Sequence, residues 1–299
     1  LWLPTRYFYH ISTFYPGGTL TWAAAYATQF FFHPWLGMGL MLLCWGAIMA
    51  LLCQQFHLRG PWRLLALLVP LALLACLVQT GYWLYYMKLQ GHAWVPTLGV
   101  LLSLLLAYIH LLLPGRWPKL CWFVLVGLAG YPLMGAWWAL ALALMATPRH
   151  LRMQRAEAVN VALALAFVIV MPPILVRQFY GQVEMSQVYL AAMPSFQYGK
   201  TDCPEYRLAY YALALSMVVC AMPALIYRNS EPAYKELRLS WVLSLLLIAA
   251  ACMGVSERWE RDTNFHKEVA MTNAIHRLDW EGVLRTMLRQ DMGDPMPPT

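Results

Sequence analysis

Three acidic side chains in one long polar stretch are the residues of this chain best suited to acid–base chemistry. They are Glu184, Asp202 and Glu205, and the first half of the chain contains no aspartate or glutamate. A carboxylate beside a hydroxyl group can act as a general base, and carboxylate oxygens also coordinate divalent metal ions. The alternative is that these acids pair with Lys200 and Arg207 and only order the loop. The three acids are therefore the candidate catalytic residues.

A second group of side chains combines positive charge, imidazole groups and aromatic rings, and it suits the binding of a phosphate or a sugar. Charge-assisted hydrogen bonds to phosphate oxygens are strong, and flat aromatic rings offer a stacking surface to a sugar ring. The alternatives are an ordinary aromatic belt at a membrane surface and interfacial hydrogen bonding by the histidines. The candidates for binding a lipid phosphate or a saccharide are Arg6, His10, His33, Tyr82, Trp83, Lys88, Lys200 and Arg207.

The spacing of cysteine and histidine predicts no dedicated metal centre. The chain has seven cysteines without a CxxC pair, and eight histidines of which no two stand at ligand spacing on one helix. A CxxC pair would indicate a zinc or redox site. No cofactor is therefore predicted, although a divalent metal ion held by the acids is compatible with the sequence.

The elements that must position these residues are long apolar segments. Hydrophobic residues make up 61% of the chain and charged residues 12%, whereas soluble domains carry about 25% charged residues. A helix needs about 20 apolar residues to cross the lipid core, and lipid offers no partner to a bare amide. The sequence therefore predicts an all-α, polytopic transmembrane helical bundle. The apolar segments are Pro34–Cys53, Leu64–Gln79, Val95–Leu113, Leu120–Thr147, Glu157–Val176, Leu208–Tyr227 and Leu239–Val255.

The basic residues assign a side of the membrane to each connection. Ten lysines and arginines lie in four connections, which the positive-inside rule places in the cytoplasm. The N-terminal segment, the loop with the three acids and the C-terminal tail then lie on the periplasmic side, and these outer segments are expected to meet membrane lipids. The net charge of +7 is scattered among short loops, so no nucleic-acid partner is predicted. The four basic connections are Gln54–Arg63, Pro114–Lys119, Pro148–Ala156 and Arg228–Arg238.

The segment Leu120–Thr147 lies between two basic connections and should cross the membrane twice. Its middle is rich in glycine and contains a proline, and both residue types favour a turn over a helix. The sequence predicts two short helices, Leu120–Gly130 and Met134–Thr147, joined by a turn at Tyr131–Leu133, and hence about eight spans. The alternative is one long tilted helix with a kink at the proline.

The first outer segment, residues 1–33, should contain a helix over Thr19–Phe32. Trp22, Tyr26 and Phe30 recur every four residues in it and line one helical face. Such a helix lies along the membrane interface or dips into it.

The remaining chain divides into a transmembrane domain, residues 34–255, and a charged tail, residues 256–299. Helical periodicity in the tail predicts two short helices, with Asp279 as the N-cap of the second. Two antiparallel helices form the unit that helical-repeat proteins stack. The tail is therefore expected to be an outer-face helical hairpin and the start of a repeat-like periplasmic domain.

The N-terminal third resembles the signature of an uncharacterised family of bacterial inner-membrane proteins, a domain of unknown function. The resemblance rests on Pro16–Gly18, Ala27–Phe32 and Pro34–Gly37, and Arg277–Trp280 resembles the start of a longer helical-repeat region in that family. It implies a multi-pass protein of the bacterial inner membrane.

A looser similarity is to membrane glycosyltransferases of the GT-C class. Those enzymes have an interfacial helix in a large first outer loop, many spans, and often an outer helical-repeat domain, and they use a polyprenyl-linked sugar donor. The catalytic acid of that class usually lies in the first outer loop, and Leu1–His33 has none. The predicted function is action on a polyprenyl-linked saccharide or envelope glycoconjugate at the outer face. The alternative is a non-catalytic scaffold or subunit of an envelope complex, with other envelope proteins bound through the C-terminal hairpin.

Overall fold

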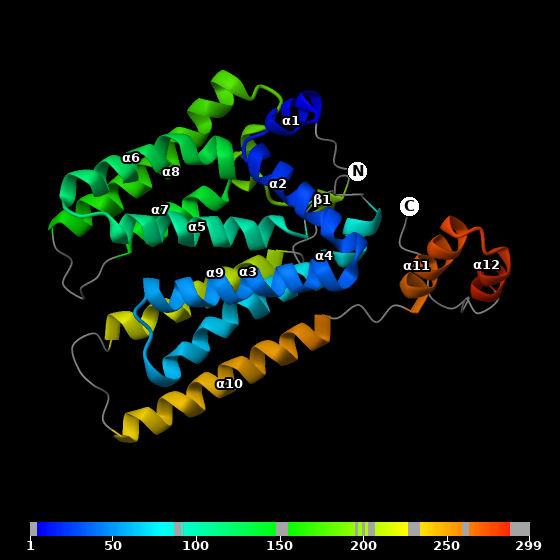
Figure 1. Ribbon diagram of the computed structural model, residues 1–299. Helices are drawn as coiled ribbons and strands as arrows, with labels where there is room; N and C mark the ends of the chain where they lie inside the picture. The colour runs from blue at the N-terminus through cyan, green and yellow to red at the C-terminus, as the bar shows by residue number, and fades with distance from the viewer. Residues whose placement is uncertain are drawn as a thin grey trace. The chain divides into compact units, whose positions relative to one another are not determined.

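The computed structural model is an all-α, multi-pass helical protein, which confirms the predicted fold class. It describes residues 5–86, 91, 93–147, 155–194, 197–198, 201–202, 207–226, 234–258 and 263–287. Helices α1 to α10 form one compact unit, residues 1–258, and helices α11 and α12 belong to a second unit, residues 259–299 (Figure 1).

The first unit contains ten α-helices, three short 3-10 helices and one pair of two-residue strands within its described residues. The elements of both units, in chain order, are α1 (Arg6–Thr13), α2 (Gly18–Thr28), η1 (Gln29–Phe32), α3 (Pro34–Gln55), η2 (Gly60–Leu67), α4 (Leu68–Tyr86), α5 (Val95–Leu112), α6 (Arg116–Met134), α7 (Trp137–Ala146), α8 (Arg155–Phe179), η3 (Met185–Leu190), β1 (Gln197–Tyr198), β2 (Thr201–Asp202), α9 (Arg207–Ile226), α10 (Tyr234–Arg258), α11 (Thr263–His276) and α12 (Trp280–Met287).

Eight apolar helices correspond to the eight predicted spans. Six are long and apolar enough to cross a membrane, and α7 and α9 are shorter apolar helices. Helix α3, with 22 residues, is about 33 Å long and matches the thickness of a lipid core. The helices alternate in direction, so the described ends that flank the four basic connections lie together, at the left of Figure 1. We call this the basic end, and the other end, which carries α1, α2 and η3, the junction end.

Helices α6 and α7 confirm that the segment after Leu120 is two helices rather than one kinked helix. They pack against each other, and the Trp138 indole Nε1 donates to the Val126 carbonyl oxygen at 2.8 Å. The predicted position of the turn, Tyr131–Leu133, is wrong, because α6 continues through Pro132. The chain turns at Gly135, whose φ of 61° and ψ of −135° suit glycine alone.

Helix α2 packs one face into the bundle and leaves the other face exposed. It packs against α5 and α6, and its buried residues are small or aliphatic: Gly18, Leu20, Ala24, Ala25 and Ala27. The aromatic stripe that the sequence marks lies on the other face, where Tyr26 is exposed and stacks edge-on against Phe30 with ring centroids 5.6 Å apart. Small side chains let helix backbones approach closely, which explains why α2 buries its alanines.

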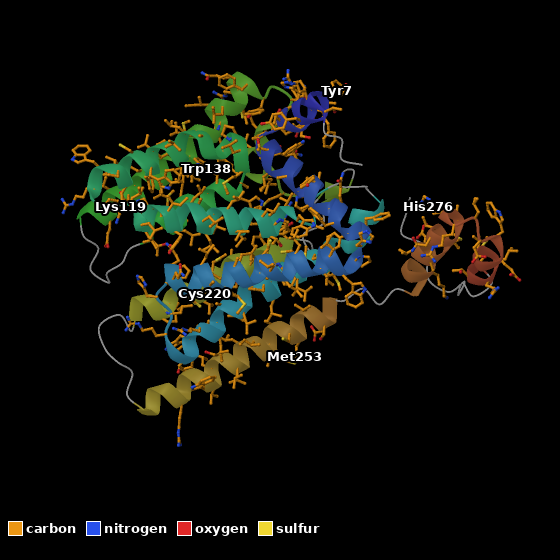
Figure 2. The ribbon with its side chains drawn as sticks, viewed as in Figure 1. Tyr7, Lys119, Trp138, Cys220, Met253 and His276 are labelled. Carbon is orange, nitrogen blue, oxygen red and sulfur yellow. The ribbon has the colours of Figure 1, made fainter. Side chains whose placement is uncertain are left out.

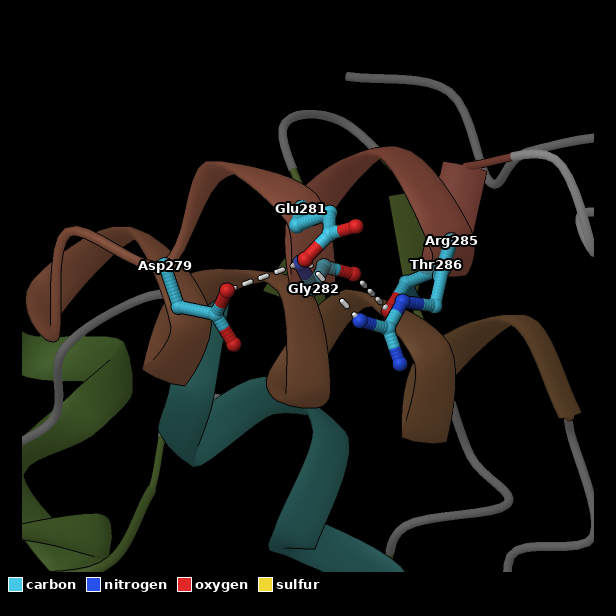
Figure 3. Close-up of polar contacts among 5 residues, drawn as sticks. All are labelled: Asp279, Glu281, Gly282, Arg285 and Thr286. Carbon is cyan, nitrogen blue, oxygen red and sulfur yellow. Dashed lines mark hydrogen bonds and ion pairs between the residues drawn. The ribbon is translucent and has the colours of Figure 1, made fainter.

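The second unit is the predicted helical hairpin. Helices α11 and α12 pack together, and the Asp279 carboxylate accepts a hydrogen bond from the backbone N–H of Gly282 at 3.0 Å, as an N-cap does (Figure 3). Arg285 forms an ion pair with Glu281 one turn earlier, at 3.2 Å. The residues between the helices close the first one, because the Asp279 N–H donates to the Ala274 carbonyl oxygen at 2.9 Å.

Candidate functional site

The three candidate acids lie in or near the connection between α8 and α9. Glu184 is exposed and precedes η3, where its carboxylate accepts a hydrogen bond from the Ser186 hydroxyl at 3.2 Å. Asp202 lies in β2, where its backbone pairs with Gln197, and its side chain is outside the described residues, as is all of Glu205. The structure therefore describes the surroundings of one candidate carboxylate, that of Glu184.

The candidate phosphate-binding and sugar-binding residues are spread over several elements. Arg6 and His10 are exposed one turn apart on α1, and His33 is exposed at the N-terminus of α3. No hydrogen bond or ion pair joins Glu184 to these three among the described residues. Arg207 is half-buried and begins α9.

The side chains of four candidates lie outside the described residues. Tyr82 and Trp83 belong to α4, but their side chains lie outside the described residues, and Lys88 and Lys200 lie outside them entirely. Within the described part of the chain, no cluster of three metal-ligating side chains occurs.

The feature that organises this end of the bundle is the position at which α7 begins. The Trp137 ring packs where a Cβ at Gly99 would be, and the Ser103 hydroxyl donates to the Trp137 carbonyl oxygen at 2.9 Å. Gly99 and Ser103 lie one and two helical turns after the start of α5. Helix α7 therefore begins beside α5 at a point about 6–12 Å from the first residue of α5, toward the basic end. At the other end, the Gln55 side-chain amide donates to the Leu144 carbonyl oxygen at 3.0 Å. Helix α7 has only 10 residues, which agrees with a first turn that lies farther from the junction end than the first turn of α5.

Two other chain segments, one around Gly17 and one around Ala191, pack against the chain just before α7. A Cβ at Gly17 would overlap Gly135 and Ala192, and a Cβ at Gly135 would overlap Ala191, so the three backbones are in direct contact. We call Gly17, Gly135, Ala191 and Ala192 the glycine junction. Gly17, Gly135 and Ala192 all have positive φ angles, of 79°, 61° and 63°.

Backbone hydrogen bonds hold the glycine junction together. The Gly17 N–H donates to the Pro132 carbonyl oxygen at 2.9 Å, and the Ala136 N–H donates to the Ala191 carbonyl oxygen at 2.8 Å. Irregular backbone within a membrane protein is tolerated where protein groups satisfy its hydrogen bonds. These contacts fix the N-terminal segment and the loop around η3 to the α6–α7 turn.

Two tyrosines anchor η3 to the bundle. The buried Tyr131 hydroxyl of α6 donates to the Val188 carbonyl oxygen at 2.7 Å. The Tyr189 hydroxyl donates to the Ile169 carbonyl oxygen at 3.2 Å, which has lost its usual i+4 donor because residue 173 is a proline. The loop that begins with Glu184 is thus held by side chains as well as by backbone.

Just before that loop, burial raises the pKa of Tyr180 above its ordinary value. Its phenol therefore stays neutral at physiological pH and is no candidate for a proton acceptor.

Sequence reasoning missed the glycine junction as a unit. Pro16–Gly18 and the glycines around Pro132 were visible as turn signals, whereas Ala191 and Ala192 carry no signal, because alanine rarely adopts a positive φ angle. Only the tertiary structure brings the three segments into contact.

Comparison with known proteins yields one match. A model of a family described as "Family of unknown function (DUF6057)" matches residues 1–296. Neither the curated proteins nor the solved structures contain a match to the chain.

Proposed function

Since the chain belongs to the family of unknown function DUF6057, we propose from its own architecture that it acts on a polyprenyl-linked saccharide or envelope glycoconjugate. The site of action is the periplasmic face of a bacterial inner membrane, and the architecture is of the GT-C type. In this proposal a carboxylate of the α8–α9 connection assists an acceptor hydroxyl, with or without a divalent metal ion.

The distribution of positive charge supports this orientation. Arg59, Arg63, Arg116 and Lys119 all lie at the basic end, and Figure 2 shows Lys119 at that end on α6. Cytoplasmic loops carry an excess of lysine and arginine, so the junction end is periplasmic in this proposal. Both the N-terminal segment and the C-terminal unit follow on that side.

The observation that carries the proposal is the glycine junction. It holds the segment before α3 and the loop after α8 in contact at one end of the bundle, as an enzyme must do to keep a donor and an acceptor in a fixed geometry. The exposed carboxylate of Glu184 lies on the loop that the junction anchors. Arg6 on α1 and Arg207 on α9 supply positive charge for a lipid phosphate, and His10 adds an imidazole group one turn from Arg6.

The proposal is tested with Glu184→Gln, Asp202→Asn and Glu205→Gln. Loss of a general base typically costs about 10²–10⁴-fold in rate, so at least one variant should abolish glycan transfer in cells while its membrane expression stays normal. Glu257→Gln is the matched control, because Glu257 is an exposed acid at the end of α10, outside this loop. Unchanged envelope glycans in all three variants, with no polyprenyl lipid bound to the purified protein, would refute the proposal.

A second candidate function, a membrane scaffold for other envelope proteins, is favoured by the surface of the C-terminal hairpin. Large apolar side chains are exposed along it: Ile275, Leu278, Trp280, Leu284 and Met287. Leu278 is 72% exposed and has a φ of 58°, a helix-ending position where glycine is strongly preferred. A leucine that is left largely exposed in this conformation is explained if a partner protein buries it.

Leu278→Gly separates the two roles of this position. Glycine removes the strain of the left-handed conformation, so the hairpin should gain up to about 1 kcal/mol of stability. If a partner uses the leucine, the same variant should lose a protein that co-purifies stoichiometrically with the wild type. A wild type that purifies alone in mild detergent argues against the scaffold.

A further inference from the structure

Helix α1 has its apolar stripe on the exposed side. Tyr7, Ile11 and Phe14 recur at helical spacing and are all exposed, and Tyr7, at 76%, is among the most exposed side chains. A helix at a water-facing surface carries polar residues on this side. Figure 2 shows Tyr7 on α1 at the edge of the first unit.

The hydroxyl side chains of α1 and its N-cap bond to the backbone of the helix itself. The Ser12 hydroxyl donates to the Phe8 carbonyl oxygen at 2.9 Å, and the Thr13 hydroxyl lies 3.0 Å from the carbonyl oxygens of both Tyr9 and His10. Thr5 caps the helix by accepting from the Phe8 N–H at 3.2 Å. These hydroxyls need no water, and they leave the outward face to apolar rings.

Helix α1 is attached firmly to the bundle by its other side. It packs against α2, and a Cβ at Gly18 would overlap the Ser12 carbonyl oxygen, so the two backbones touch. The Tyr9 ring lies edge-on to the Trp22 ring at 5.5 Å. The direction of the apolar stripe is therefore fixed by the bundle.

Helix α1 carries one formal charge, that of Arg6, and no acidic residue. Arg6 and His10 are both exposed on it, and the sequence has no aspartate or glutamate before Glu157. At the same end of the bundle, Phe32 and Trp35 are highly exposed around the first turn of α3, where the lipid-facing surface of a spanning helix begins. An apolar face at this end of the bundle suits the boundary between headgroups and acyl chains, and the Arg6 guanidinium suits a phosphate headgroup.

We propose that α1 is an interfacial helix that lies in the phospholipid headgroup layer at the junction end. Tyr7, Ile11 and Phe14 enter the boundary between headgroups and acyl chains, and Arg6 and His10 meet lipid phosphates. This role belongs to α1. Helix α2, for which the sequence allowed it, buries one face against α5 and α6 instead. The inference needs only a multi-pass membrane protein and does not depend on the glycan chemistry proposed above.

The test reconstitutes the intact chain in vesicles of phosphatidylethanolamine and phosphatidylglycerol that contain a phospholipid with a diazirine near its headgroup. After illumination, mass spectrometry maps the cross-links. The expected result is cross-linking of Tyr7, Ile11 and Phe14 together with Phe32 and Trp35, which serve as the internal reference at the same end of the bundle. A Tyr7→Ser/Phe14→Ser double variant should reduce cross-linking to α1 roughly tenfold relative to the reference.

Cross-links on α3 without any on α1 would overturn the proposal, because the apolar stripe would then face water or a partner protein and not lipid. An unchanged α1 signal in the double variant would also overturn it, because the aromatic side chains would then not hold the helix in the lipid. Gly18→Ala provides a second route, since it pushes α1 from α2 and should alter the α1 cross-links. Gly39→Ala is its matched control, because a Cβ at Gly39 meets nothing within 4 Å.

Discussion

At the scale of single residues, two neighbouring tryptophans at the start of α7 differ in one respect. Trp137 and Trp138 are 3% and 1% exposed, but the Trp138 indole donates to the Val126 carbonyl oxygen. The buried Trp137 indole nitrogen has no hydrogen-bond partner among the residues that the structure describes. A buried hydrogen bond contributes about 1 kcal/mol, and an unsatisfied buried donor costs about 1–3 kcal/mol. The two indoles therefore make a matched pair.

We expect Trp138→Phe to be clearly more destabilising than Trp137→Phe. Both variants lose similar ring volume, but only the first loses a hydrogen bond, and the second removes an unsatisfied donor. The difference in the free energy of unfolding should be about 1–3 kcal/mol, measured by thermal unfolding of the purified protein in one detergent. Equal losses in the two variants would mean that the Trp137 indole has an acceptor in the membrane.

Which residues could be identified from the sequence depended on whether their environment is local. Asp279 was identified as an N-cap because its partner, Gly282, is three residues away. Gly135 was recognised only as one of several turn formers, because its contact with Ala191 joins distant segments. The roles of Glu184 and Arg207 remain predictions, since carboxylate chemistry is decided by neighbours that sequence spacing does not fix.

At the scale of elements, the α6–α7 turn depends on a glycine. Gly135→Ala should be strongly destabilising, because its backbone conformation suits glycine alone and the new Cβ would lie about 2.5 Å from the Ala191 carbonyl oxygen. We expect a loss of about 1–3 kcal/mol or more. Gly46→Ala is the control: it lies in α3 with open space around its Cβ, and alanine is the better helix former by about 1 kcal/mol.

The readout for this pair is the melting temperature together with proteolysis of the loop around η3. Gly135→Ala should lower the melting temperature and speed cleavage of the loop, because the same turn holds Ala191 through the Ala136 N–H. Loss of stability without faster cleavage would show that the turn and the loop are not coupled.

Element boundaries show where periodicity stops being informative. The apolar segments predicted the spanning helices well, because the lipid core imposes both length and composition. Helix α8 passes through Pro172 and Pro173, as the predicted segment Glu157–Val176 does, and ends three residues beyond that segment, at Phe179. The Tyr189 hydroxyl donates to the carbonyl group that Pro173 leaves unpaired, a contact from outside the helix. The short helices α1 and η3 were not predicted, because a single turn or two of helix is decided by tertiary packing.

At the scale of the whole molecule, the count of crossings decides on which side each end lies. With α6 and α7 as two crossings, the four basic connections share one side, and α1 and the C-terminal hairpin share the other. If residues 116–147 crossed only once, every segment after them would exchange sides, and the arginines before α8 would face outward. The packed pair of α6 and α7 favours the first arrangement.

Alkaline phosphatase, which is active only outside the cytoplasm, tests this arrangement when it is fused after chosen residues. Fusions after Lys119 and after Arg152 should both be inactive, and fusions after Gly181 and after Glu257 should both be active. The two basic fusion points flank the α6–α7 pair, so their agreement reports two crossings between them. Activity after Arg152 with none after Lys119 would mean a single crossing, and it would move the loop of Glu184 and the C-terminal hairpin to the cytoplasm.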